Sequence, residues 1–497
     1  MLTKAMCIVI NQVKCGKLVK YMKRNILIIL LLAASVAYAA GPFFNRGQNQ
    51  YMNKNYDRAR ELFLQGLKAG ERGNTYFFLG EIERLQGNLP EAQNYYALAL
   101  TVNTTQRYVN NAYMNFILIA EQRGDTQALA RTSKIMWQRN KDNSAKDRIE
   151  QLINRLVWTD NRAAIEKYNQ ALRLRSTEPA KSIELFAEAV KLAGDFIAAQ
   201  FEQAMLLSAN EKPKEAKRLF EDITTKIPIH ASAHIALANI LYDEEEYEAS
   251  IEHYNKALEF GFLSRDTEFL IFSQLSKAHF ATDRPTEALN AAAQASRIRP
   301  SDIPTLLFQS SIYIRQRDLE NAMRILQSAE KIDGQNPDVL LQIGSIYFRN
   351  KDPKHIQYFD RLAGVIISNP RINCRQYSQA LNILLRSHFD SENYARIGSI
   401  APRMENCLSN ESILITARAF YHLENYSESI KYFERLKLNN DQDIILLCCA
   451  YVKNENKAKA ESILRNATEN SSLINSAQKN DVLKPIINEI RAKRSTP

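Results

Sequence analysis

The sequence predicts an all-α fold in which antiparallel helix pairs stack into an α-solenoid, and three observations support this. The chain has 497 residues but only 15 glycines and 14 prolines, too few for the many turns of a β-sandwich or β-barrel. Apolar residues recur at helical spacing along most of the chain. A frame of small and aromatic residues also repeats every 34 positions, as from Ala216 to Ser250 and from Ala288 to Ala322.

The clearest repeat lies at residues 74–104. Gly80 in its first predicted helix is followed by Ala92, Tyr96 and Ala99 in its second, with spacings of 12, 4 and 3 positions. Parts of the same frame recur at Gly47, Ala59, Phe63 and Gly66; Ser182, Phe186 and Ala189; Ala204, Ala216 and Phe220; Ala238, Ser250, Tyr254 and Ala257; Ala288 and Ala295; Ala322 and Ala329; Ser429 and Phe433; and Ala460 and Ala467.

This frame resembles the signature of the tetratricopeptide repeat (TPR), a helix–turn–helix unit. The resemblance implies a TPR-type α-solenoid, a right-handed superhelix of about 10–12 helix pairs. Small residues such as Gly80 and Ala92 let the two helices of a pair cross closely. The aromatic residue of the second helix then fills the space against the next pair. Because one pair cannot bury its own apolar face, the pairs must stack.

The frame is strong in three blocks and weak between them. We expect an extension at 1–21 that is not translated if Met22 is the initiator, a signal peptide at 22–39, an N-terminal TPR block at 40–106, degenerate helical repeats at 107–164, a central TPR block at 165–364, degenerate helical repeats at 365–410, a C-terminal TPR block at 411–470, and a capping helix (roughly Gln478–Lys493) with a basic tail at 471–497.

Residues 22–39 have the layout of a secretory signal peptide. A basic start precedes an apolar run at 26–37, which is too short to cross a bilayer because a crossing takes about 20 residues. Ala37-Tyr38-Ala39 then forms a cleavage site of the A-x-A type. We expect export, with a mature chain that begins at Ala40. The alternative is that the segment stays attached as a membrane anchor.

The net charge of +10 does not predict a nucleic-acid partner, because much of it lies in one place. Residues 1–39 hold six basic residues and no acidic residue, which leaves the rest of the chain close to balanced. A surface that binds phosphates needs Lys and Arg clustered on one face. Outside the N-terminal segment only a short basic tail is present, at Arg491, Lys493 and Arg494.

Four cysteines follow the predicted signal peptide. Cys374 and Cys407 are 33 positions apart, about one repeat. That spacing allows a disulfide between neighbouring repeats if the two Cα atoms come within about 7 Å, and export would place both residues in an oxidising compartment. Cys448 and Cys449 lie in an apolar helix, where we expect small buried residues.

The sequence carries no catalytic motif, and we expect neither enzymatic activity nor a cofactor. HExxH, GxSxG, P-loop and GxGxxG motifs are all absent. His230 and His234 are four positions apart on a predicted helix, a spacing that suits two metal ligands. We expect them instead to frame the start of that helix, and we predict no metal site.

The TPR resemblance implies that ligands lie on the concave face, which the first helices of the pairs line. Aromatic residues and arginine often dominate the energy of an interface. The alternative is that the aromatic residues of this face only pack between repeats. The carboxylate clamp of chaperone-binding TPRs is not expected, because Ile235 and Met205 occupy two of its positions. The candidate partner-binding residues are Asn239, Tyr242, Lys277, Phe280, Arg315, Phe348 and Arg349.

From these observations we expect an exported, periplasmic scaffold that binds other proteins or peptides in envelope assembly or secretion. The first alternative is an adaptor that an uncleaved N-terminal segment anchors in the inner membrane, facing the periplasm. A more distant hypothesis is a member of a TPR-bearing envelope enzyme group. A catalytic domain needs a long stretch outside the repeats, and the chain offers none.

Overall fold

The structure is a computed structural model that describes residues 41–140, 143–466 and 472–495. The described residues form two compact units, those up to residue 282 (the first unit) and those from residue 283 onward (the second unit). All regular elements of the described residues are helices, so the predicted all-α solenoid is confirmed. The predicted extension at 1–21 and signal peptide at 22–39 lie outside the described residues.

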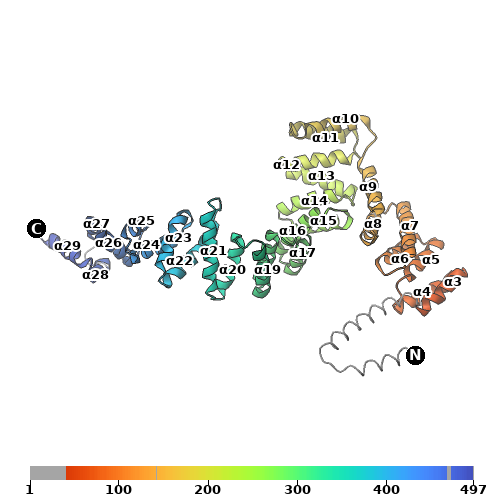
Figure 1. The fold of residues 1–497 in the computed structure, drawn as a ribbon. Helices are drawn as coiled ribbons and strands as arrows, with labels where there is room; N and C mark the ends of the chain where they lie inside the picture. The colour runs from red at the N-terminus through yellow and green to blue at the C-terminus, as the bar shows by residue number, and fades with distance from the viewer. Residues whose placement is uncertain (1–40, 141–142, 467–471, 496–497) are drawn as a thin grey trace, which may run out of the picture. The chain divides into compact units, whose positions relative to one another are not determined.

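Figure 1 labels the helices. Those described in the first unit are α3 (Pro42–Met52), α4 (Tyr56–Lys68), α5 (Thr75–Leu85), α6 (Leu89–Thr101), α7 (Gln106–Arg123), α8 (Thr126–Asn140), α9 (Ser144–Val157), α10 (Arg162–Leu174), α11 (Pro179–Leu192), α12 (Ile197–Ala209), α13 (Pro213–Lys226), α14 (Ala231–Asp243), α15 (Tyr247–Phe260) and α16 (Arg265–Ala281).

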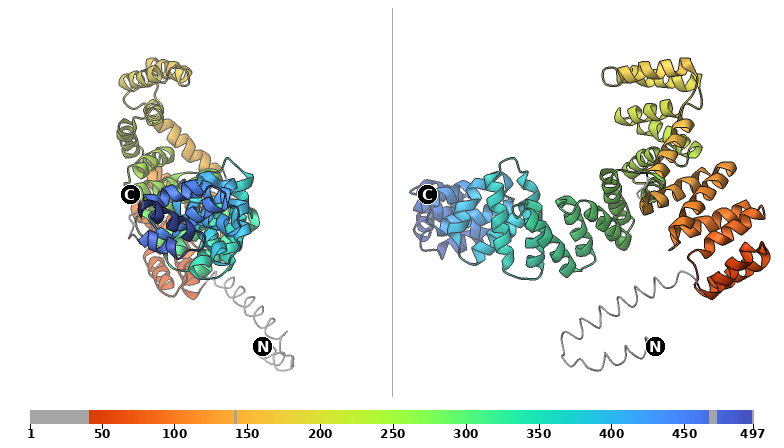
Figure 2. Two further views of the ribbon diagram at one scale, coloured as in Figure 1. Left: turned by 90° about the vertical axis from the view of Figure 1, so that its left-hand side faces the viewer. Right: turned by 45° about the vertical axis from the view of Figure 1, so that its right-hand side comes forward.

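The second unit continues the same arrangement, with its helix pairs stacked in chain order (Figure 2). Its described helices are α17 (Pro285–Ile298), α18 (Ile303–Arg315), α19 (Leu319–Ile332), α20 (Pro337–Arg349), α21 (Lys354–Ser368), η1 (Cys374–Tyr377), α22 (Ser378–Asp390), α23 (Tyr394–Ile400), η2 (Ala401–Cys407), α24 (Asn410–His422), α25 (Tyr426–Phe433), α26 (Asp441–Lys453), α27 (Lys457–Arg465), α28 (Ser472–Gln478) and α29 (Lys484–Ser495).

The two helices of a pair cross where the first helix carries a small residue. A Cβ atom added to Gly80 would lie 2.7 Å from the ring of Tyr96, and one added to Gly344 would lie 2.4 Å from the ring of Phe359. Both rings are fully buried. The aromatic side chain of the second helix therefore rests directly on the backbone of the first, which explains why only a small residue fits there.

The same aromatic residues also reach the next pair, as the sequence predicts. The ring of Phe63 lies against Gly47 of its own pair. It also stacks on Phe78 of α5, with 5.6 Å between the ring centroids. One buried ring thus closes the crossing within a pair and joins that pair to its neighbour.

Serine in the second helix adds a hydrogen bond to this crossing. Its hydroxyl group donates to a backbone carbonyl of the first helix, which gives that buried carbonyl a second donor. The donor–acceptor distance is 2.8 Å in each of three pairs, Ser182 with Ala171, Ser250 with Ala238 and Ser429 with Ala417.

A residue in the left-handed conformation lies in the turn between the two helices of most pairs. Glu245, for example, lies seven positions after the crossing residue Ala238 and has a φ angle of 62°. A residue with a Cβ atom pays about 1 kcal/mol for this conformation, so the packing of the pair outweighs the local preference. The residues at this position are Lys54, Gly87, Gly124, Glu211, Glu245, Asp283, Arg317, Lys351, Glu392, Glu424 and Glu455.

The first unit departs from a simple stack at α8, within the stretch expected to be degenerate. The Nζ atom of Lys134 donates to the carbonyl oxygens of Leu258 and Gly261, the second at 2.8 Å. The ring of Trp137 packs edge-on against Phe262, 5.7 Å between centroids. Helix α8 therefore contacts the end of α15, far along the chain, whereas a solenoid repeat ordinarily contacts only its neighbours. Figures 1 and 2 show α3–α8 and α10–α15 as two stacks within this unit.

The second unit departs from regular repeats at α22 and α23. The pair is present, and its turn has the usual left-handed residue, Glu392. Its second helix, however, ends at Ile400 and continues as the short 3₁₀ helix η2. Within η2, Met404 has non-helical backbone angles (φ −128°, ψ 27°). The interrupted second helix explains why the sequence frame is weak at 365–410.

The C-terminal cap differs from the single helix that the sequence predicts at 478–493. Two helices, α28 and α29, enclose a turn there. Ile486, Ile487 and Ile490 of α29 are buried in one cluster with Leu464 of α27. The cap is therefore amphipathic and contributes to the core of the last repeats.

We predict that Gly344→Ala destabilises the chain by about 1–3 kcal/mol, because the added methyl group must displace the Phe359 ring from a packed core. Gly364→Ala is the matched control, since it lies in α21 with no atom within 4 Å of an added Cβ atom. That variant should gain about 0.5–1 kcal/mol from helix propensity. Urea unfolding followed by circular dichroism measures both, and equal shifts in the two variants would contradict the crossing geometry.

Candidate functional site

The structure divides the seven candidate partner-binding residues between the two units. Asn239, Tyr242, Lys277 and Phe280 belong to α14 and α16 of the first unit. The other three belong to α18 and α20 of the second unit. Each set is therefore described within its own unit.

The candidates of the first unit are partly occupied by contacts within the chain. The hydroxyl group of Tyr254 donates to Oδ1 of Asn239. The ring of Tyr242 is half-buried and packs edge-on against Tyr247, 5.3 Å between centroids. Phe280 is also half-buried, and Lys277 is exposed. Part of the surface of both aromatic candidates, Tyr242 and Phe280, is therefore buried within the chain and is not available to a partner.

The candidates of the second unit are more open. Phe348 is 44% exposed, and its ring meets the His355 ring edge-on at 5.2 Å. Arg349 beside it is exposed. Arg315 is exposed but bound, because its guanidinium group lies 3.0 Å from Oδ1 of Asp283.

Phe348 and Arg349 line a groove of about 450 Å³ in the second unit. The groove runs across the first helices of three successive pairs, α18, α20 and α22. It is lined by Ser311, Ile314, Leu341, Gln342, Ser345, Ile346, Phe348, Arg349, Phe359, Gln376, Gln379, Ala380 and Ile383.

The groove combines an apolar surface with side-chain amides. Leu341 and Ile383 are half-buried, whereas Gln376 of η1 and Gln379 of α22 are exposed. Gln342 is fixed by two serines: the hydroxyl group of Ser310 donates to its Oε1, and its Nε2 donates to Oγ of Ser311 at 3.3 Å. Because a carboxamide both donates and accepts, this lining suits a ligand with exposed peptide groups and an apolar side chain.

Sequence reasoning missed most of this lining. Leu341 and Ser345 lie seven and three positions before Phe348, on the same face of a helix, so helical spacing from a known candidate would find them. Gln376, Gln379 and Ile383 belong to the stretch where the repeat frame is weak, and no spacing rule places them.

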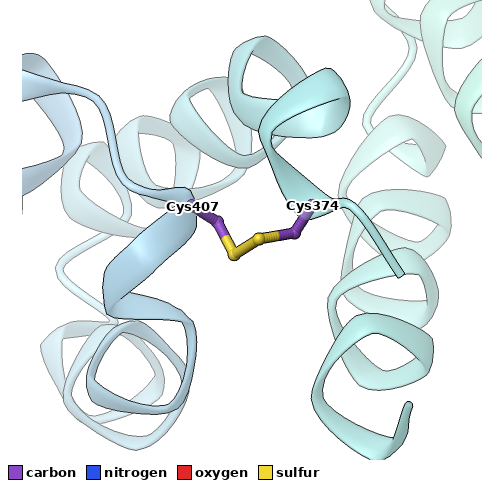
Figure 3. The surroundings of a disulfide bond; sticks show 2 residues. All are labelled: Cys374 and Cys407. Atoms are coloured by element: carbon purple, nitrogen blue, oxygen red, sulfur yellow. A yellow bond between two sulfur atoms is a disulfide. The ribbon is translucent and has the colours of Figure 1, made fainter. Parts of the chain in front are cut away.

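Cys374 and Cys407 form a disulfide, with 5.3 Å between their Cα atoms (Figure 3). The bond joins the first residue of η1 to the last residue of η2. It therefore links the segment that carries Gln376 of the groove to the interrupted second helix of the same pair.

The other two cysteines of the described residues are buried thiols. Cys448 and Cys449 lie in α26. Burial raises the pKa of the Cys448 thiol to about 12 and also raises the pKa of Cys449. The thiolate is the form that attacks a disulfide. Because both thiols stay protonated, we do not expect them to exchange with the Cys374–Cys407 disulfide.

The histidines near the start of α14 make local contacts. His230 caps the helix, its Nδ1 accepting the backbone N–H of Ala233 at 3.1 Å. Nε2 of His234 lies 2.9 Å from the carbonyl oxygen of Pro228, and its Nδ1 lies 2.8 Å from Nδ1 of His253. Burial lowers the pKa of His234 to about 4. In the part of the chain that the structure describes, three or more metal-ligating side chains do not come together.

None of the described helices combines the length and the apolar character that crossing a bilayer requires.

Comparison with known proteins identifies the repeat. The family model described as tetratricopeptide repeat matches residues 44–106 and 201–261, which correspond to α3–α6 and α12–α15. No curated protein sequence matches the chain.

Several solved structures are similar over part of the chain. YrrB, described as a TPR protein with an unusual peptide-binding site, is 18% identical and covers 37% of this chain and 93% of its own, with a TM-score of 0.33. PilF of Pseudomonas aeruginosa is 15% identical and covers 41% and 91%, with a TM-score of 0.33. MamA of Desulfovibrio magneticus RS-1 is 13% identical and covers 36% and 99%, with a TM-score of 0.33.

We predict that Cys374→Ser combined with Cys407→Ser lowers the free energy of unfolding by about 2–4 kcal/mol. Amide hydrogen exchange should also become faster in η1 and at the start of α22, while α14 of the first unit serves as the internal reference. Unchanged exchange in η1 would show that the disulfide does not hold this wall of the groove.

We also predict that stability falls as the pH drops from 6.5 toward 4. His234 is neutral when folded, and its pKa rises from about 4 to the ordinary 6.5 on unfolding. Below pH 6.5 the unfolded chain therefore binds a proton at His234 that the folded chain does not. The free energy of unfolding falls by roughly 3 kcal/mol in total, and this loss is complete only below both the folded and the unfolded pKa of His234. The urea midpoint of the His234→Gln variant should fall less between pH 7 and pH 5 than that of the unchanged chain. Equal decreases would contradict this assignment.

Proposed function

We propose that this chain, which is a tetratricopeptide-repeat protein, is an exported scaffold that binds a partner protein in the groove across α18, α20 and α22. The proposed setting is the periplasm, in envelope assembly or secretion. The observation that carries the binding proposal is the groove itself, which lies on the first helices of successive pairs and leaves Leu341, Phe348 and Ile383 partly exposed.

The lining of the groove supports a protein segment as the ligand. The apolar lining provides affinity, and the amides of Gln342, Gln376 and Gln379 fix the position of the bound peptide groups.

Two features support export. The sequence at 22–39 has the n-region, apolar run and cleavage site of a signal peptide. The disulfide between Cys374 and Cys407 is a bond that forms and persists in oxidising compartments. N-terminal sequencing of the protein from the host should give Ala40. If the N-terminal segment stays attached, the protein will remain with the membrane fraction in high salt, which is the anchored alternative.

The groove is tested by replacing Leu341 and Ile383 together with serine in the mature chain from Ala40. We expect loss of at least about tenfold in partner capture, because two apolar side chains at the centre of the interface are truncated. Leu270→Ser is the matched control, since Leu270 is 58% exposed and lies in α16 of the first unit. A photo-crosslinking residue at Ser345 should label the same partner. Capture that survives unchanged in the double variant would contradict the proposal.

A further inference from the structure

We infer that the groove across α18, α20 and α22 recognises an extended, acidic segment of its partner, in which a carboxylate group lies next to an apolar side chain. This inference rests on the proposed function and names the class of partner segment. It depends on the charge of the groove, the amides that line it and the position of its apolar surface.

The charge of the groove is carried by Arg349. Among the described residues that line it, Arg349 is the one with a charged side chain, and no acidic residue is present. Arginine is the side chain best suited to bind a carboxylate group through two parallel hydrogen bonds. The groove therefore complements a negative charge.

Two arginines of the neighbouring first helices are paired within the chain. Arg315 at the end of α18 pairs with Asp283 at 3.0 Å, and Arg386 in α22 pairs with Glu411 at 2.5 Å. The structure gives Arg349 no carboxylate partner within the described residues. Arg349 therefore lines the groove with a guanidinium group that is open to an external carboxylate group.

The amides along the groove favour an extended ligand over a helix. An extended segment exposes its backbone N–H and C=O groups, whereas a helix uses them internally. Gln376 and Gln379 are exposed, and Gln342 is held by Ser310 and Ser311. Each carboxamide can both donate to and accept from the backbone of an extended segment.

The apolar residues that would contact the partner lie close to Arg349 in the sequence of α20. Phe348 directly precedes Arg349, and Leu341 lies two helical turns earlier. Because side chains of an extended segment alternate between its two faces, an acidic residue two positions from an aliphatic one places both on the groove.

The test uses fluorescein-labelled decapeptides and the mature chain from Ala40. The probe has the sequence Gly-Ser-Ser-Leu-Ser-Asp-Ser-Leu-Ser-Gly, in which Asp lies two positions from each Leu, and matched peptides carry Asn or Lys in place of Asp, or Ser in place of Leu. Fluorescence anisotropy at low and high salt gives the affinities. We expect the Asp peptide to bind about tenfold more tightly than the Asn peptide, with the difference decreasing at high salt.

Two arginine variants separate Arg349 from general surface charge. Arg349→Ala should remove the preference for Asp over Asn, and Arg349→Glu should favour the Lys peptide. Arg386→Ala, which removes an exposed arginine outside the groove, should leave the preference unchanged. Circular dichroism confirms that each variant is folded.

The outcomes distinguish the inference from the function on which it rests. Equal affinity for the Asp, Asn and Lys peptides, or a preference for Lys, overturns the acidic ligand. If that result comes with loss of binding in the Leu341→Ser and Ile383→Ser double variant, the groove still binds peptides and the proposed function stands. If the double variant binds the Asp peptide as tightly as the unchanged chain, the groove is not the site and both proposals fail.

Discussion

The two helices of a pair cross so closely that only a small residue fits beneath the aromatic ring of the second helix. A buried aromatic ring rests on a small residue, as Tyr96 does on Gly80. The ring at this position can also contact the next pair, as Phe63 does with Phe78. This contact sets the distance between helices and therefore the position of every side chain on the first helices. The turn that joins the two helices places Glu245 in the left-handed conformation, where backbone hydrogen bonds such as Glu246 N–H to the carbonyl oxygen of Leu241 close the end of the first helix.

Much of the fold is encoded in local spacing and was therefore predictable. Gly80, Ala92 and Tyr96 show the crossing, and the period of 34 positions shows that it repeats. The contact of Lys134 with the end of α15 was not predictable, because its partners lie more than a hundred positions along the chain. The site was predicted only in part. Phe348 and Arg349 follow from the repeat frame, whereas Gln376 and Ile383 lie where the frame fades.

The groove lies beside the least regular pair of the second unit. Helix α23 is short, and Met404 interrupts the helix that would continue it. A disulfide between Cys374 and Cys407 joins the two ends of this pair. A weak repeat can thus still form part of the groove, because the disulfide fixes the position of η1 where regular helix packing is interrupted. The same bond is one of the two features that support the proposed export.

We propose that a partner occupies the first helices of the second unit. Hydrogen exchange of the mature chain, measured with and without the captured partner, is the decisive test of this proposal. We expect slower exchange at residues 341–349 and 376–383, with no change in α14 or α16 of the first unit. Protection confined to the second helices, such as α19 and α21, or to the first unit, would contradict it.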